Sequence, residues 1–210
     1  MLNAQDLIRD GKLLPEAIEH AHADPGELVK ALSGAGDGPS FAALALVAGL
    51  CGVQQALPAL LAGLSREDHG GKAAAWALAR LDSERAVIDA IAGGGLDVRE
   101  NGYYSLSVRA ALGKASPQVA TAMAERVAAE IARAKQKMTG LGEHALRPLA
   151  ILGAPGTDAL IQQVLEADPY TDKFELQRLR KAVADGSRDQ DSQRELAGPW
   201  VALFADHVYA

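Results

Sequence analysis

The chain has 210 residues and a formal net charge of −6, and 49% of its residues are hydrophobic although only 4% are aromatic. This length can bury a substantial core, and a core with so few aromatic rings must consist mainly of alanine, leucine, valine and isoleucine, which favours closely packed helices. The excess of acidic residues argues against nonspecific binding to nucleic acid, which requires a basic surface.

The first 38 residues predict a helical cap at the N-terminal end. Asp24 fits the N-cap position of a helix in which Pro25 is the first residue and Glu27 the third. The segment is polar, with seven acidic residues against three basic ones. A polar, irregular end unit is what a stack of helical repeats needs to close its exposed core.

An Ala-x-Leu triplet recurs through the middle of the chain. The triplets end at Leu50, Leu81, Leu112 and Leu152, so the first three are 31 residues apart and the fourth follows after 40. Self-similarity at this period is typical of stacked helical repeats. We therefore expect Leu81 and Leu112 to be buried at equivalent positions.

Each triplet closes the first helix of a predicted helix pair. Ser83, Ser116 and Thr157 are the expected N-caps of three second helices, and the glycines at 93–95 are expected to end one of them. A further helix is predicted over residues 172–184, with Gly186 as its C-cap. The predicted pairs are 40–50 with 54–64, 72–81 with 84–92, 97–112 with 116–138, and 144–152 with 157–167.

The C-terminal segment predicts a polar linker followed by a short helix. Residues 187–195 are polar throughout, and Trp200, Phe204 and Tyr209 follow at near-helical spacing. We expect this helix to dock on the last repeat and to leave the protein monomeric. The alternative is a helix that reaches a second copy.

Residues 38–65 carry no charge, which raises the question of a membrane span. Gln54, Gln55 and Pro58 lie in the middle of this stretch, and polar residues are costly inside a bilayer. A helix pair buried by its neighbours explains the stretch better, with Cys51 as a small core residue. The N-terminus lacks the basic-then-apolar order of a signal peptide, so we expect a cytoplasmic protein.

Equivalent apolar positions flank the four triplets: Leu44, Ala75, Leu106 and Leu146 before them, and Leu57, Ile88 and Val119 after them, with Leu160 one place later. Residues 73–91 and 97–113 resemble HEAT-like repeats of the phycobilisome-lyase type, and the resemblance covers residues 40–167. Two positions depart from the pattern: Arg109 replaces an apolar residue, and Gly102 interrupts the start of a helix.

This resemblance implies an all-α fold, a right-handed α-solenoid of about four HEAT-like helix pairs with helical caps. It implies a single domain over residues 1–210, with a cap over 1–38, repeats over 40–167, and C-terminal helices and a tail over 168–210. Members of this family serve mostly as scaffolds and adaptors. A minority are chromophore lyases, deoxyhypusine hydroxylases or DNA glycosylases, and the fold alone does not choose among them.

The titratable residues give no catalytic or metal-binding pattern. Glu16 and His20 share a helix face, but no further ligand supports them, so a solvated ion-pair face is the better interpretation. The hydroxylase-like enzymes use repeated His-Glu pairs, whereas Glu19-His20 and Glu143-His144 have the opposite order and occur only twice. We expect no metal and no cofactor.

Nucleic-acid binding is the weaker alternative. Basic residues slightly outnumber acidic ones over residues 116–150, and Trp76, Tyr103 and Tyr104 are candidates for stacking on bases. The excess is too small to outweigh the negative charge of the chain, so we expect a solvated face and core aromatic residues. The basic residues in question are Arg126, Arg133, Lys135, Lys137 and Arg147.

The sequence therefore favours a non-catalytic scaffold or adaptor that binds a protein or peptide on a concave face lined by the second helices. A chromophore lyase and, less favoured, a DNA glycosylase-like protein remain the alternatives. The polar positions of the second helices are the candidate binding residues, here called the seven surface candidates: Arg85, Asp89, Gln118, Thr121, Glu125, Gln162 and Glu166.

Overall fold

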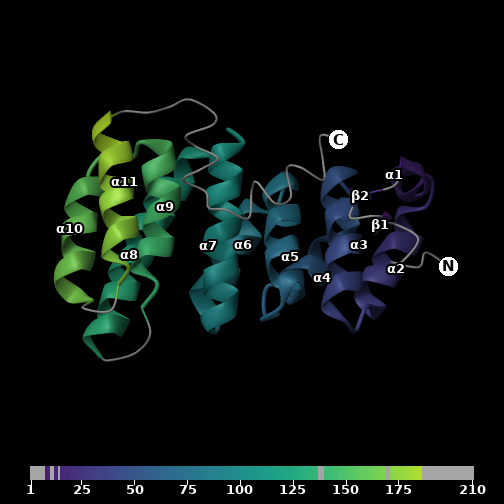
Figure 1. Ribbon diagram of the computed structural model, residues 1–210, viewed down its shortest axis with the longest axis horizontal. Coiled ribbons are helices and arrows are strands. Elements are labelled where there is room, and N and C mark those ends of the chain that lie inside the picture. The colour runs from purple at the N-terminus through teal and green to yellow at the C-terminus, as the bar shows by residue number, and fades with distance from the viewer. Residues whose placement is uncertain (1–7, 10–11, 14, 137–139, 169–170, 186–210) are drawn as a thin grey trace. The chain divides into compact units, whose positions relative to one another are not determined.

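The computed structural model describes residues 8–9, 12–13, 15–136, 140–168 and 171–185 (Figure 1). It confirms an all-α protein, in which the predicted first and second helices follow one another in the expected order. The helices are α1 Pro15–Ala23, α2 Pro25–Gly34, α3 Gly38–Leu50, α4 Leu57–Gly63, α5 His69–Arg80, α6 Glu84–Gly93, α7 Leu96–Ala111, α8 Pro117–Lys135, α9 Gly142–Leu152, α10 Thr157–Ala167 and α11 Lys173–Asp185, with a 3-10 turn, η2, over Gln54–Ala56.

The remaining regular structure in the described part is a short antiparallel pair of strands. Strand β1 is Ile8–Arg9 and strand β2 is Lys12–Leu13, with Ile8 opposite Leu13. Neither strand exceeds two residues, so the pair does not change the fold class.

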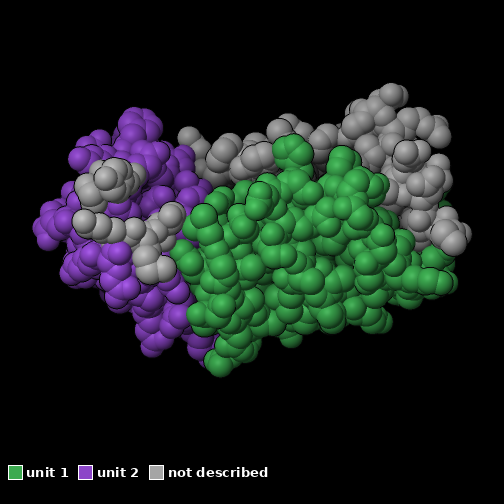
Figure 2. All heavy atoms as spheres, turned by 90° about the horizontal axis from the view of Figure 1, so that it is seen from below, with its two compact units in different colours: residues 1–105, 200–210 green, residues 106–199 purple. Residues whose placement is uncertain are grey.

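The described residues fall into two compact units (Figure 2). The first contains the described residues up to Ser105, and the second contains those from Leu106 onward, so the boundary lies within α7. The arrangement of all helix pairs as one solenoid domain stays a prediction.

In the first unit α3 packs closely on α5, and α2 lies beside α3 (Figure 1). Small residues allow the close approach: a Cβ added at Gly49 would lie 2.7 Å from the Cα of Ala77 and 3.2 Å from the ring of Trp76. Gly102 has a similar role rather than interrupting a helix, because it lies inside α7 and an added Cβ would lie 2.4 Å from Cγ1 of Ile91. The alanine-rich composition therefore serves helix-to-helix contact.

In the second unit, α9 packs against α8, α10 and α11 (Figure 1). Leu146, Leu149 and Ile161 are buried in this core. Arg180 of α11 also joins Asp158 of α10, with 2.7 Å between Nε and Oδ1.

Burial recurs at the positions in and before the triplets, but after them Val119 is buried and the equivalent Leu57, Ile88 and Leu160 are only half-buried. The alanine of every triplet is buried, as are all four apolar residues that precede the triplets. Leu81 is also buried, but Leu112 is only half-buried, so the expectation of equivalence is wrong for this pair. The buried positions are Ala48, Ala79, Ala110 and Ala150, together with Leu44, Ala75, Leu106 and Leu146.

The ends of the first helices explain the difference between Leu81 and Leu112. After α7 the chain turns through Gly113 at φ +68, and Lys114 N donates to Arg109 O at 3.0 Å, as in a Schellman C-cap. After α5 the chain instead leaves in an extended conformation at Leu81, with ψ 169. The different exit turns the leucine side chain inward in one repeat and leaves it at the rim in the other.

The helix starts confirm Asp24, Ser83 and Ser116 at N-cap positions, but of these three only Asp24 caps its helix with a side-chain hydrogen bond, and Thr157 is not the N-cap of α10. Asp24 Oδ1 accepts from Glu27 N at 2.9 Å. Ser83 Oγ donates to Leu78 O and Thr157 Oγ1 donates to Ala154 O, at 2.6 Å in each case, and Ser116 makes no side-chain cap bond. Gly156, at φ 80, takes the N-cap position of α10 instead. A hydroxyl can donate as well as accept, so its sequence position does not determine which bond it makes.

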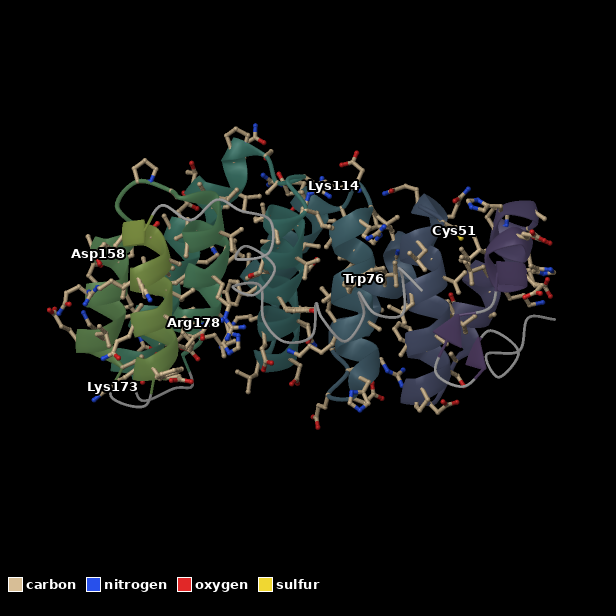
Figure 3. The ribbon with its side chains drawn as sticks, turned by 45° about the horizontal axis from the view of Figure 1, so that its top comes forward. Cys51, Trp76, Lys114, Asp158, Lys173 and Arg178 are labelled. Atoms are coloured by element: carbon tan, nitrogen blue, oxygen red, sulfur yellow. The ribbon has the colours of Figure 1, made fainter. Side chains whose placement is uncertain are left out.

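The uncharged stretch at 38–65 is divided among α3, η2 and α4, and no helix in the described part of the chain is long and apolar enough to cross a membrane. Cys51 lies half-buried at the end of α3 (Figure 3), and burial raises the pKa of its thiol. The predicted C-terminal helix with Trp200, Phe204 and Tyr209 lies outside the described residues, as do the linker at 187–195 and Met138 at the predicted end of α8.

Candidate functional site

The seven surface candidates are all exposed on second helices. Arg85 and Asp89 lie on α6 in the first unit, whereas the other five lie on α8 and α10 in the second unit. The candidates therefore form two groups, each on its own unit.

Several of the seven surface candidates contact each other along one helix. Arg85 Nε lies 3.0 Å from Asp89 Oδ2, and Gln162 Nε2 donates to Glu166 Oε1 at 2.8 Å. Both contacts join residues four apart, and such exposed pairs contribute only about 0.2–0.5 kcal/mol. A partner can therefore exchange them for its own contacts at small cost.

The aromatic residues considered for base stacking are buried. Trp76, Tyr103 and Tyr104 are each at most 5% exposed, and the guanidinium of Arg80 lies 4.7 Å from the centroid of Trp76 (Figure 3). Three of the basic residues considered with them pair with acids. Arg126 Nη2 lies 4.0 Å from Glu125 Oε2, Arg133 Nη1 lies 3.1 Å from Glu130 Oε1, and Arg147 Nε lies 3.0 Å from Glu175 Oε1. This arrangement fits the interpretation of core aromatics and a solvated face.

The histidines of the described residues do not gather with other metal ligands. His20 Nε2 lies 2.7 Å from Glu27 Oε2, which joins α1 to α2 in place of the expected contact with Glu16. In the described ranges no three His, Cys, Asp or Glu side chains are grouped so that they could hold a metal ion.

The first unit contains a polar recess of about 330 Å³, here called the recess. It lies where the loop between α4 and α5 meets the first turns of α5 and α7. Its volume is at the lower end of the range of about 300–1,000 Å³ that is usual for small-molecule sites. The lining residues are Arg66, Glu67, Asp68, His69, Lys72, Asp97, Glu100 and Asn101.

Arg66 and Asn101 hold the wall of the recess. Arg66 donates to both carboxylate oxygens of Asp68, at 3.2 and 3.1 Å, and its guanidinium lies 4.8 Å from the ring centroid of Phe41. This pairing holds the pKa of Asp68 below its usual value. The buried Asn101 Nδ2 donates to the backbone oxygens of Leu64 and Arg66, at 2.9 and 3.3 Å.

Gly71 allows the wall to come this close to α5. A Cβ at this position would lie 2.3 Å from Arg66 O and 2.6 Å from Asn101 Nδ2. Gly70 N donates to Asp68 Oδ1 at 2.8 Å, so the same carboxylate also caps α5. The recess is thus built on a rigid helix start rather than on an independent loop.

The charges inside the recess are unbalanced. Lys72 Nζ lies 2.5 Å from Glu100 Oε1 and 5.6 Å from the ring centroid of Tyr104, and Arg66 is neutralised by Asp68. Glu67 and Asp97 have no hydrogen-bond or ion-pair partner in the part of the chain that the structure describes. Carboxylates therefore exceed the lysine and arginine side chains by two.

Sequence reasoning missed the recess. Its residues come from two segments that are about 30 positions apart, and each segment reads as the ordinary polar start of a helix. The available signal was Gly70-Gly71 at a helix start, because paired glycines inside a helix are unfavourable unless another chain segment approaches closely.

A second buried polar cluster lies in the second unit. Glu143 Oε2 accepts from Thr171 Oγ1 at 3.0 Å, and burial raises the pKa of Glu143 above its usual 4.5. Glu175 bridges Arg147 and Arg178, with a 3.0 Å contact to each. The Arg147–Glu175 contact joins α9 to α11, and the Glu143–Thr171 bond joins α9 to the segment before α11.

The class of protein that these observations define is an all-α protein of helix pairs with a polar recess at one helix start. Comparison of the chain with protein-family models, with curated proteins and with solved structures found no match.

Proposed function

We propose that this protein is a non-catalytic interaction module, a scaffold or adaptor that binds a protein or peptide. In this proposal the helix pairs stack as a right-handed α-solenoid of HEAT-like repeats. The second helices line its concave face, and the seven surface candidates lie on that face.

The observation that carries the proposal is the contrast in burial between first and second helices. Nine of the 13 residues of α3 and nine of the 12 of α5 are buried. By contrast, two of the ten residues of α6 and four of the 19 of α8 are buried. The first helices thus act as core, and the second helices offer one long polar face each, which suits recognition of an extended partner.

Site-specific photo-crosslinking in the native cell tests the proposal. A benzophenone amino acid at Thr121 or Gln162 should give one adduct of the same mass from both positions, because both face the partner. Matched probes at Lys114 and Lys173, which are exposed in the same unit but lie off the second helices (Figure 3), should not give it.

A charge reversal provides the second control. Glu125→Lys should reduce the yield of the Thr121 adduct, because rim charges influence association even where they add little affinity. The proposal fails if the adduct forms equally from Lys114 and Lys173, or if no probe on α8 or α10 gives a specific adduct.

A further inference from the structure

The recess has the shape and charge to hold a cation. It is hollowed to about 330 Å³ and is lined by four carboxylates but only two lysine or arginine side chains. Each of these basic side chains already contacts one acid, so Glu67 and Asp97 remain to neutralise an incoming positive charge. A cleft of one sign with low-dielectric walls concentrates ligands of the opposite sign.

The geometry points away from a bare metal ion. A divalent cation needs several oxygen ligands within about 2.0–2.6 Å of a single point. In the described residues no three acidic or histidine side chains are so grouped. An organic cation suits the recess better, because its charge is carried on an extended chain that can reach separate carboxylates.

The recess already holds the alkylammonium group of one of its own side chains, Lys72. Lys72 reaches Glu100 with its ammonium and lies over the ring of Tyr104, which combines a carboxylate with an aromatic face. The wall behind it is fixed by Asn101 and by the Arg66–Asp68 pair, so the side chains that must be ordered on binding are those of Glu67 and Asp97.

We propose that the recess binds an arginine or lysine side chain of the partner protein, with Glu67 and Asp97 as the carboxylates that receive it. That the cation belongs to a protein rests on the proposed function. The recess itself does not depend on it, because its charge and shape belong to the first unit alone.

Nuclear magnetic resonance on the full chain tests the proposal directly. The probes are N-acetyl-arginine methylamide and N-acetyl-lysine methylamide, followed through the amide signals of Gly70 and Gly71 and the side-chain amide of Asn101. We expect saturable shifts of these signals that weaken at high salt. The citrulline analogue, which is similar in shape but uncharged, should not produce them.

Paired variants locate the binding site. Glu67→Gln with Asp97→Asn should weaken binding of the arginine probe on the order of fivefold, the scale expected for two partly exposed ion pairs. Glu19→Gln with Asp82→Asn removes the same charge at exposed positions of the same unit outside the recess and should leave binding unchanged. Thermal melting shows that both pairs are folded.

Four outcomes would each overturn the proposal. In two of them, the control pair weakens binding of the arginine probe as much as the recess pair does, or the citrulline analogue binds as tightly as the arginine probe. In the other two, Mg²⁺ saturates the same signals, or free spermidine binds more tightly than the arginine probe by tenfold or more. Failure of the crosslinking experiment with binding of the arginine probe intact would reject the interaction module but not the cation site.

Discussion

Removing the Asn101 amide should destabilise the first unit, because this side chain ties α7 to the loop before α5. Asn101→Ala deletes hydrogen bonds of 2.9 and 3.3 Å to Leu64 O and Arg66 O. Each bond contributes about 0.5–1.5 kcal/mol net, and a buried carbonyl left without a partner costs about 1–3 kcal/mol. The stronger bond is the buried one, so we expect a loss of about 2–4 kcal/mol in the free energy of unfolding.

Gly71→Ala should act on the same contact from the other side. Its Cβ would lie 2.3 Å from Arg66 O and 2.6 Å from Asn101 Nδ2, and overpacking of this kind costs about 1–3 kcal/mol. When Asn101 is already alanine, one clash is gone and the loop that carries Arg66 O is free to yield. The double variant should therefore be more stable than the sum of the single losses predicts, by roughly 0.5–3 kcal/mol.

Urea unfolding followed by tryptophan fluorescence measures this coupling. Trp200→Phe in every variant leaves Trp76, in the first unit, as the reporter. The control is Gly49→Ala combined with Asn101→Ala, which should be additive, because the three atoms nearest to the Cβ added at Gly49 belong to Ala77 and Trp76. Additivity of Gly71→Ala and Asn101→Ala within about 0.3–0.5 kcal/mol would refute the account of the recess wall.

The remaining predictions concern the core, the pH dependence and the alternatives. Leu81→Ala should lower the free energy of unfolding by about 2–5 kcal/mol, and Leu112→Ala should lower it clearly less, because Leu112 is only half-buried. The same urea curves measure both losses, and a loss under about 0.5 kcal/mol at Leu81 would contradict the alignment. Glu143 binds its proton more tightly in the folded protein than in the unfolded chain, because burial raises its pKa above the usual 4.5. Its ionisation therefore lowers the free energy of unfolding by the full amount above the raised pKa and has no effect at a pH below 4.5. Glu143→Gln should therefore raise stability at neutral pH, with a gain that shrinks as the pH falls toward 4.5, and a gain independent of pH would contradict the burial argument. In a gel-shift assay at low salt we expect no retention of DNA, and retention that disappears when Arg126 and Arg133 are replaced would favour the nucleic-acid alternative. Turnover in a bilin-transfer assay would likewise favour the lyase.

The helix order could be predicted because local residues fix where helices begin and end. Asp24 before Pro25, the glycines at 93–95 and the apolar spacing along 116–138 each act within a few residues. Hydroxyl residues were less informative: Ser83 stands at the expected position, but its Oγ turns back to Leu78 O. This bond spans only five residues, but a hydroxyl can either cap the next helix or bond the end of the preceding one, and its sequence position does not decide which.

The recess could not be predicted for a related reason. Asn101 meets Leu64 and Arg66 across more than 30 residues of sequence, and the contact depends on how α7 crosses the start of α5. The seven surface candidates, by contrast, needed only helical periodicity to be placed on exposed faces. Periodicity predicts which side of a helix faces solvent but not where a loop and two helix starts enclose a cavity.

The contact between α3 and α5 has a consequence for the entropy of folding. Glycine and alanine have no side-chain rotamers to lose on burial, whereas longer apolar residues lose about 0.5–1 kcal/mol each in that way. Gly49 and Ala77 can therefore be brought together with almost no side-chain ordering, and Trp76 is the large group that must settle between the helices. The small residues also prevent these two helices from sliding past each other, because a methyl group has no alternative rotamer that could fill the gap left by such a shift. The two helices should accordingly keep a single register until the first unit unfolds.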